Sequence, residues 1–248
     1  MKKLVSLMLI LLCIFTFGSC KIDDSNLSND ITTQNPTETV REVLIEGSEW
    51  KLYKNGVLHI ETDAGARNWA AYSSDHYFTP KWKEEWRSEV VPIVQKIVLE
   101  EGVTVLPEHT ALNLSNLSEI ELPDTIQIIE KEALFICPNL HEVAIPRNVS
   151  RIEGVPVTGD YETQWELRIS VNPENMWYEV TDGMLIEKET RTLLYAYSTE
   201  EEIEVPAYVR SVIRYAFLNC FQLKTLYINT DCEVDEYAVA GHVAIVRK

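Results

Sequence analysis

Short triplets in which two large apolar residues flank a third residue, in most cases a polar one, recur along the chain, and the first three begin 23 residues apart, at Ile97, Ile120 and Val143. Such alternation predicts short strands with one buried face. The apolar pairs are Ile97 and Leu99, Ile120 and Leu122, Val143 and Ile145, Leu167 and Ile169, Ile203 and Val205, and Leu226 and Ile228. Three triplets are followed at once by Pro123, Pro146 and Pro206. Proline lacks a backbone donor, so each strand is expected to stop there.

Four of the six triplets are followed by a second apolar pair, and turns of small residues come after such pairs. The second pairs are Val103 and Leu106, Ile126 and Ile129, Val149 and Ile152, and Val209 and Val212. The turns at 133–140 and 216–223 match in register, with Cys137 and Cys220 in the same place. A unit this short cannot bury its apolar faces alone, so the units must stack. The predicted fold class is a repeat solenoid with mainly short β-strands and few helices.

The order of these motifs is that of a known family. A strand ending in Ile-Pro, then Val-x-x-Ile, then Ala-Phe-x-x-Cys-x-x-Leu resembles the BspA-like bacterial leucine-rich repeats, most strongly over residues 97–153 and 203–241. The resemblance implies a surface lipoprotein of the Bacteroidetes type, and members of the family are often associated with adhesion to matrix proteins or other cells.

The repeat is interrupted once. Leu167 lies 24 residues after Val143, but Ile203 follows only 36 residues later, which is one repeat plus 13. The extra length lies near 172–202, where Asn-Pro-Glu-Asn at 172–175 and the apolar stretches on either side of 188–191 resemble a hairpin seen between repeats in the same family. A hairpin insertion is therefore expected there.

Residues 41–96 depart from the repeat. Apolar and polar residues alternate on both sides of Asn55-Gly56, which is a strong hairpin signal. The segment also resembles the opening that often precedes BspA-like repeats. We expect it to form a β-hairpin N-terminal cap that covers the first open face of the solenoid at 97–248.

The beginning of the chain has the pattern of an export signal. Lys2 and Lys3 precede an apolar stretch that ends near Phe17, and Gly18 and Ser19 come directly before Cys20. The sequence predicts a signal peptide over 1–19, and the segment at 17–20 resembles a lipobox in which Cys20 takes the lipid. An ordinary cleavage site that contains a cysteine is the alternative. Residues 20–40 are too polar to bury a core and are expected to be a flexible tether.

Charge and residue spacing argue against several function classes. The formal net charge is −17, so nucleic acid is not an expected partner, and the expected membrane contact is through the lipid anchor alone. The five histidines show no HxH or HExxH spacing, the cysteines form no zinc or redox motif, and there is no phosphate loop or nucleophile elbow. No cofactor, no metal and no catalytic residue is predicted, and Cys137, Cys220 and Cys232 are interpreted as small buried apolar residues.

Two sets of residues are candidates for ligand binding. The first consists of polar side chains that should point outward from the strands, mostly acidic: Glu119, Glu121, Glu142, Arg168, Glu202, Glu204 and Tyr227. They would suit a cationic protein or peptide, although charges on an exposed sheet also keep it soluble. The second is an aromatic cluster of Trp69, Tyr72, Trp82 and Trp86, which could bind glycans. Packing inside the cap is the favoured alternative for these aromatics.

The sequence therefore favours a lipid-anchored binding or adhesion protein of the cell surface or periplasm, with a protein or glycan ligand and no enzymatic activity. A structural or envelope-assembly lipoprotein that binds bacterial partners is the first alternative. A glycan-active enzyme, based on the many carboxylates and the aromatic cluster, is the second.

Overall fold

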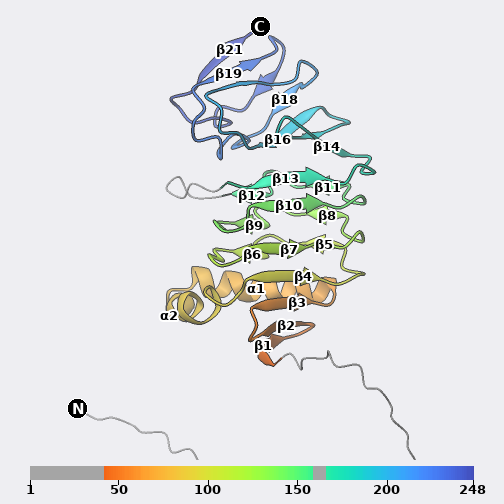
Figure 1. The fold of residues 1–248 in the computed structure, drawn as a ribbon, viewed down its shortest axis with the longest axis vertical. Coiled ribbons are helices and arrows are strands. Elements are labelled where there is room, and N and C mark those ends of the chain that lie inside the picture. The colour runs from red at the N-terminus through yellow and green to blue at the C-terminus, as the bar shows by residue number, and fades with distance from the viewer. Residues whose placement is uncertain (1–41, 159–165) are drawn as a thin grey trace, which may run out of the picture. The chain divides into compact units, whose positions relative to one another are not determined.

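The computed structural model describes residues 42–158 and 166–248. The predicted signal peptide, Cys20 and the predicted tether lie outside the described residues. The described part is built mainly from short strands that stack along a solenoid (Figure 1). Within it, no helix is both long and apolar enough to cross a bilayer.

Successive coils place their strands in parallel ladders on different faces of the solenoid. The strands that open the coils are β4 (Lys96–Leu99), β7 (Glu119–Glu121), β10 (Glu142–Ile145), β13 (Arg168–Val171), β17 (Glu202–Glu204), β19 (Thr225–Ile228) and β21 (Ala244–Arg247). A second ladder holds β5 (Val105–Leu106), β8 (Ile128–Ile129) and β11 (Arg151–Ile152), and a third holds β6 (Ala111–Leu112), β9 (Leu134–Phe135) and β12 (Val157–Thr158). Further along the chain, β18 (Ser211–Val212) and β20 (Glu233–Val234) continue a ladder from the insertion.

The strand registers confirm the 23-residue period. Ile97 pairs with Ile120 between β4 and β7, and Ile203 pairs with Leu226 between β17 and β19. The next step differs from the expectation: Val143 pairs with Ile169 and not with Leu167, so the strands β10 and β13 are 26 residues apart and not 24. Equivalent positions of neighbouring coils therefore lie side by side, which is the condition for a side-chain pattern to repeat along one face.

The N-terminal cap contains the expected hairpin. Strands β1 (Val43–Gly47), β2 (Trp50–Tyr53) and β3 (Val57–Ile60) are antiparallel, and β3 pairs in parallel with β4 of the first coil. Gly56 has φ +83° in the turn, and a Cβ there would lie 2.6 Å from the Ile93 carbonyl oxygen. The hairpin therefore continues the solenoid sheet and covers its first coil.

The cap also contains a helix that the sequence pattern did not predict. Helix α1 (Asp63–Phe78) begins after Thr62, whose hydroxyl accepts the Gly65 N–H, and it is followed by α2 (Pro80–Glu85) and a π-helical turn η1 (Trp86–Val90). Asp63 in the first turn accepts hydrogen bonds from Thr104 N–H (2.6 Å) and hydroxyl (2.5 Å). This carboxylate joins the helix to the first coil.

The insertion forms three antiparallel strands, β14 (Tyr178–Thr181), β15 (Met184–Glu187) and β16 (Thr192–Ala196). Strand β16 then pairs in parallel with β18, so the insertion returns the chain to the solenoid. The excess length predicted from the spacing thus forms a sheet that is continuous with the later coils.

The buried apolar residues form two cores, and the boundary between them lies at the insertion. The larger extends from Trp50 to Tyr195 and the smaller from Met184 to Ala238. Strand β15 contributes to both, because Leu185 belongs to the larger core while Met184 and Ile186 belong to the smaller.

Candidate ligand-binding site

The outward residues predicted on the strands are exposed, except for the half-buried Tyr227, but the strands that carry them belong to three separate sheets. Glu119, Glu121, Glu142 and Arg168 lie on β7, β10 and β13, whereas Glu202, Glu204 and the half-buried Tyr227 lie on β17 and β19. No strand pairing among the described residues joins β13 to β17. The seven residues therefore do not form one continuous patch on a single sheet.

Cations offset much of the acidic charge on this strand face. Lys96 Nζ donates to Glu119 Oε1 (2.9 Å) and forms a second ion pair with Glu121. Lys248 Nζ lies 3.1 Å from Glu204 Oε2 and 4.0 Å from the centre of the Tyr227 ring. Exposed pairs of this kind contribute little stability, but they make the surface a mixture of charges instead of a uniformly acidic one.

The aromatic cluster packs inside the cap. Trp69 and Trp86 are fully buried, and Tyr72 is half-buried against them. The Trp69 indole N–H donates to the Thr110 carbonyl (2.7 Å), and its ring lies edge-on to Trp50 at 5.0 Å. The side chain of Trp82 lies outside the described residues. Buried indoles cannot stack on a ligand, so the cluster gives no support to a glycan site in the cap.

A groove crosses the solenoid at a place that the sequence analysis did not single out. It has a volume of about 470 Å³ and is lined by Gly102, Thr104, Thr125, Gln127, Asn148, Ser150 and Trp177. We call this surface the inter-coil groove. Its volume lies within the range of small-molecule sites, roughly 300 to 1,000 Å³.

Six of the seven lining residues come from equivalent positions in three successive coils. Gly102, Thr125 and Asn148 are 23 residues apart, and so are Thr104, Gln127 and Ser150. The sequence therefore contained a signal for this groove: small or uncharged polar residues recur at two fixed places of the repeat. The contribution of Trp177 could not be seen, because the insertion brings it there from outside the repeat.

Several polar groups of the inter-coil groove are held by bonds within the protein. The Thr125 hydroxyl donates to the Val103 carbonyl (2.8 Å) and accepts the Gly102 N–H (3.0 Å). The Asn148 amide donates to the Asp124 carbonyl (2.7 Å). By contrast, the exposed Gln127 side chain makes no hydrogen bond within the described part of the chain.

Trp177 is fixed in position by a buried asparagine. The Asn175 amide nitrogen donates to the carbonyls of Pro146 (2.9 Å) and Val149 (3.0 Å), and its oxygen accepts the N–H groups of Trp177 and Tyr178 (both 2.8 Å). Asn175 is 1% exposed, whereas Trp177 is 39% exposed. One side chain thus attaches the insertion to the third coil and leaves the indole at the edge of the groove.

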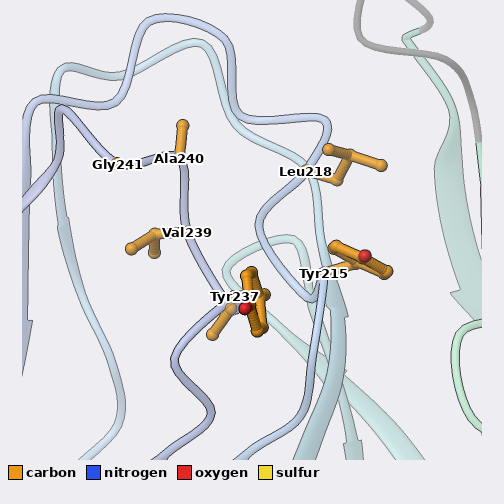
Figure 2. Close-up of a pocket in the computed structure, with 7 residues that line it drawn as sticks. Tyr215, Leu218, Tyr237, Val239, Ala240 and Gly241 are labelled. Atoms are coloured by element: carbon orange, nitrogen blue, oxygen red, sulfur yellow. The ribbon is translucent and has the colours of Figure 1, made fainter.

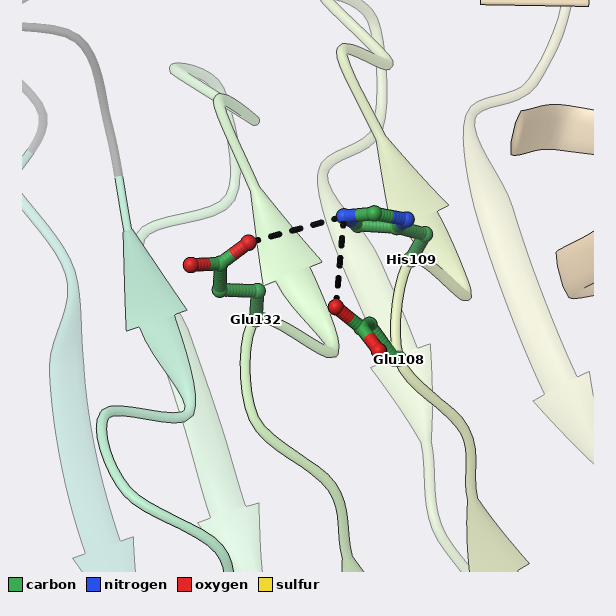
Figure 3. Close-up of side chains that lie close together, drawn as sticks. All are labelled: Glu108, His109 and Glu132. Carbon is green, nitrogen blue, oxygen red and sulfur yellow. Dashed lines mark ion pairs between the residues drawn. The ribbon is translucent and has the colours of Figure 1, made fainter.

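Figure 3 shows a cluster of Glu108, His109 and Glu132 that joins two coils. His109 Nε2 lies 3.9 Å from Glu108 Oε1 and 3.6 Å from Glu132 Oε2, and its Nδ1 is hydrogen-bonded to Ser74 Oγ at 3.1 Å. Glu132 comes from the next coil, 23 residues after His109, so the repeat period contained a signal that these two side chains lie side by side. One imidazole and two carboxylates are groups that bind divalent metals, but Lys131 Nζ already lies 3.3 Å from Glu108 Oε1.

A smaller pocket lies near the end of the solenoid and has a volume of about 130 Å³ (Figure 2). Tyr215, Leu218 and Tyr237 line it together with the segment 238–241. The Arg214 guanidinium lies 4.0 Å from the centre of the Tyr237 ring. The pocket is well below the usual size of a ligand site.

The three cysteines of the described residues are unsuited to nucleophilic chemistry. Cys137, Cys220 and Cys232 are buried free thiols, as the repeat predicted. Burial raises the pKa of the Cys137 thiol and of the Cys220 thiol to about 12 each. Because the thiolate is the reactive form, these residues serve as small apolar parts of the core.

The fold and its repeated coils define a bacterial leucine-rich-repeat solenoid. Residues 91–155 and 189–243 match the BspA type leucine rich repeat region in six copies. The resemblance inferred from the sequence is confirmed. No curated protein matches the chain.

The chain is similar to solved structures. A leucine rich cell surface protein of Faecalibacterium prausnitzii has a TM-score of 0.53 and 19% identity over 66% of this chain. The chain spans 44% of that protein. The pneumococcal vaccine antigen PcpA has a TM-score of 0.49 and 19% identity, over 61% of this chain and 38% of its own.

Proposed function

We propose that this chain is a lipid-anchored binding protein of the bacterial cell surface that contacts its ligand through the inter-coil groove and has no enzymatic activity. The observation that carries the proposal is the groove itself, which crosses three coils and is bordered by an exposed tryptophan. Repeat solenoids use such extended surfaces to hold partners.

The residue types in the groove favour binding over catalysis. Its lining consists of glycine, threonine, glutamine, asparagine, serine and tryptophan, none of which titrates near neutral pH. General acid or base catalysis needs a group that can exchange a proton there. The buried thiols, with their raised pKa values, offer no nucleophile in its place.

Surface location is proposed on two grounds. The leader and Cys20 have the pattern of a lipoprotein signal, and the Faecalibacterium protein of the same fold is described as a cell surface protein. The alternative is a periplasmic lipoprotein that assembles with bacterial partners.

Protease treatment of intact cells distinguishes these locations. We expect external protease to remove the chain from intact cells, and Cys20→Ala to move it from the membrane fraction to the soluble fraction. Survival of the chain on intact cells, with digestion only after lysis, would favour the periplasmic alternative.

The role of the groove can be tested by filling it. Cells displaying the chain are measured for attachment to surfaces coated with mucin or purified matrix protein. We expect Gln127→Trp to reduce attachment and Gln222→Trp to leave it unchanged, because Gln127 lines the groove and Gln222 is an exposed residue outside it. Equal attachment by both variants would show that another face binds the ligand.

A further inference from the structure

We propose that the inter-coil groove binds a neutral oligosaccharide, with one sugar ring stacked on Trp177 and neighbouring hydroxyls bonded to the groups presented by the three coils. This inference rests on the proposed function and names the class of ligand. It is independent of the aromatic cluster of the cap, which is buried.

The hydrogen-bonding groups of the groove match a polyhydroxyl ligand. The hydroxyls of Thr104 and Thr125 already donate their protons to Asp63 and to the Val103 carbonyl. The lone pairs that remain on these two hydroxyl oxygens can therefore only accept hydrogen bonds from a ligand. The Gln127 amide and the Trp177 indole N–H make no hydrogen bond within the described residues, so they are available as donors. A sugar hydroxyl both donates and accepts, and can therefore bond to each of these groups.

The spacing of the coils supports a ligand made of repeating units. Parallel strands lie about 4.8 Å apart, so three coils present like groups over roughly 10 Å. This length accommodates a disaccharide or trisaccharide. The aromatic plane at one end and the polar groups along the rest are the combination found in small-molecule sites.

Anionic ligands do not fit the groove. No lysine, arginine or histidine is among its lining residues, and the chain carries a formal net charge of −17. Phosphate and sulfate groups need cations or several free N–H donors. An acceptor-rich groove in an acidic protein therefore discriminates against nucleotides and sulfated glycans.

A peptide strand is disfavoured for a different reason. A bound peptide usually adds to a free sheet edge, but the backbone N–H groups of Gln127 and Ile128 donate to the Thr104 carbonyl, and those of Ser150 and Arg151 donate to the Gln127 carbonyl. The backbone at this site is already paired from coil to coil.

The backbone that carries Trp177 is already ordered. Its own N–H is bonded to Asn175 Oδ1, and its carbonyl accepts the Lys188 N–H at 2.8 Å. The next residue, Tyr178, is 1% exposed, and its Oη accepts the Ile152 N–H at 2.8 Å. Because the backbone on both sides of the indole is fixed, little backbone conformational entropy is lost when a sugar ring stacks on it.

The test uses the mature chain purified in a detergent without a sugar headgroup. Binding is measured by calorimetry and tryptophan fluorescence against a panel of uncharged oligosaccharides of the β-glucan, α-glucan, mannan and xylan types. Heparin serves as the anionic comparison. We expect at least one neutral oligosaccharide to bind and heparin not to bind. Trp177→Ala should weaken binding by roughly tenfold or more, and Gln127→Ala should weaken it to a smaller extent.

Matched variants control for general damage to the surface. Met176 is 75% exposed and adjacent to Trp177, and Gln222 is an exposed glutamine outside the groove, so Met176→Ala and Gln222→Ala should bind as the unaltered chain does. The proposal is overturned if no neutral oligosaccharide binds, if heparin binds more tightly, or if Trp177→Ala binds normally. The proposed function is judged separately. If one of these results is obtained but Gln127→Trp still reduces attachment of cells, the groove binds another class of ligand and the proposed function stands.

Discussion

At the scale of single residues, one buried side chain determines how the insertion meets the solenoid. Asn175 forms four hydrogen bonds to main-chain groups, two on the third coil and two on the insertion. A buried main-chain group that loses its hydrogen-bond partner lowers the free energy of unfolding by about 1 to 3 kcal/mol. Asn175 therefore links stability of the insertion to the position of Trp177.

We expect Asn175→Ala to lower the free energy of unfolding by about 3 kcal/mol or more, and also to weaken oligosaccharide binding because Trp177 is no longer fixed. Urea denaturation measures the first effect and calorimetry the second. Asn139→Ala is the control, since its amide makes one exposed hydrogen bond, to the Ser115 carbonyl, and should cost about 1 kcal/mol or less. Equal losses in the two variants would contradict the role given to Asn175.

The buried thiols and a buried tyrosine phenol should make the folded chain less stable at alkaline pH. Burial raises the pKa of the Cys137 and Cys220 thiols to about 12, and that of the Tyr178 phenol to about 12. The folded chain therefore keeps protons that the unfolded chain releases above its ordinary pKa values, near 9.0 for cysteine and 10.0 for tyrosine. Stability from these groups is complete below pH 9 and is lost as pH rises toward 12.

We expect the free energy of unfolding to be level near pH 8 and to fall above pH 9, by at most about 1.4 kcal/mol per pH unit for each group. Cys137→Ala should make the fall shallower, whatever its effect on stability at pH 7. Urea unfolding at a series of pH values measures both slopes. Identical slopes in the two proteins would show that Cys137 does not contribute.

At the scale of elements, the sequence predicted the strands well and the cap helix not at all. Strands with alternating apolar residues, such as β10 with Val143 and Ile145, have a clear period and appear where expected. Helix α1 buries Gly65, Ala66, Trp69, Ala70 and Ser73. Four of these residues are small, so the buried face lacks the large apolar residues that identify an amphipathic helix. Close packing of a helix made of small residues depends on its neighbours, which the local pattern does not contain.

The same limit applies to the candidate site. The outward direction of Glu119 and Glu142 follows from strand alternation alone. The groove needs three coils in register and a tryptophan delivered by the insertion. The cluster of Glu108, His109 and Glu132 likewise depends on which residues neighbouring coils bring together.

Trp69 provides a test of the cap at this scale. We expect Trp69→Ala to cost about 3 to 5 kcal/mol, because a fully buried indole and its hydrogen bond to Thr110 are lost. Phe78→Ala on the same helix is the control, since Phe78 is 59% exposed and should cost about 1 kcal/mol or less. Chemical denaturation gives both values. A stable Trp69→Ala protein that no longer binds oligosaccharide would instead place a sugar site in the cap.

At the scale of the whole described solenoid, the two cores are joined through the insertion. Strands β15 and β16 are buried along nearly their whole length, because one face packs on the larger core and the other on the smaller. Repeat proteins are stabilised by contacts between neighbouring units, and their ends can open separately. The smaller core, toward the last coils, has fewer buried residues to hold it closed.

We therefore expect a core substitution to act mainly within its own cluster. Leu226→Ala, in the smaller core, should speed hydrogen exchange over residues 202–238 and leave the coils at 96–152 protected. Leu117 is equally buried, in the larger core. Leu117→Ala should therefore speed hydrogen exchange over residues 96–152 and leave residues 202–238 protected. Exchange followed by mass spectrometry resolves these segments without requiring global unfolding. If either variant speeds exchange uniformly over both clusters, the insertion couples them into one cooperative unit, and a ligand held at Trp177 would then stabilise the last coils as strongly as the first.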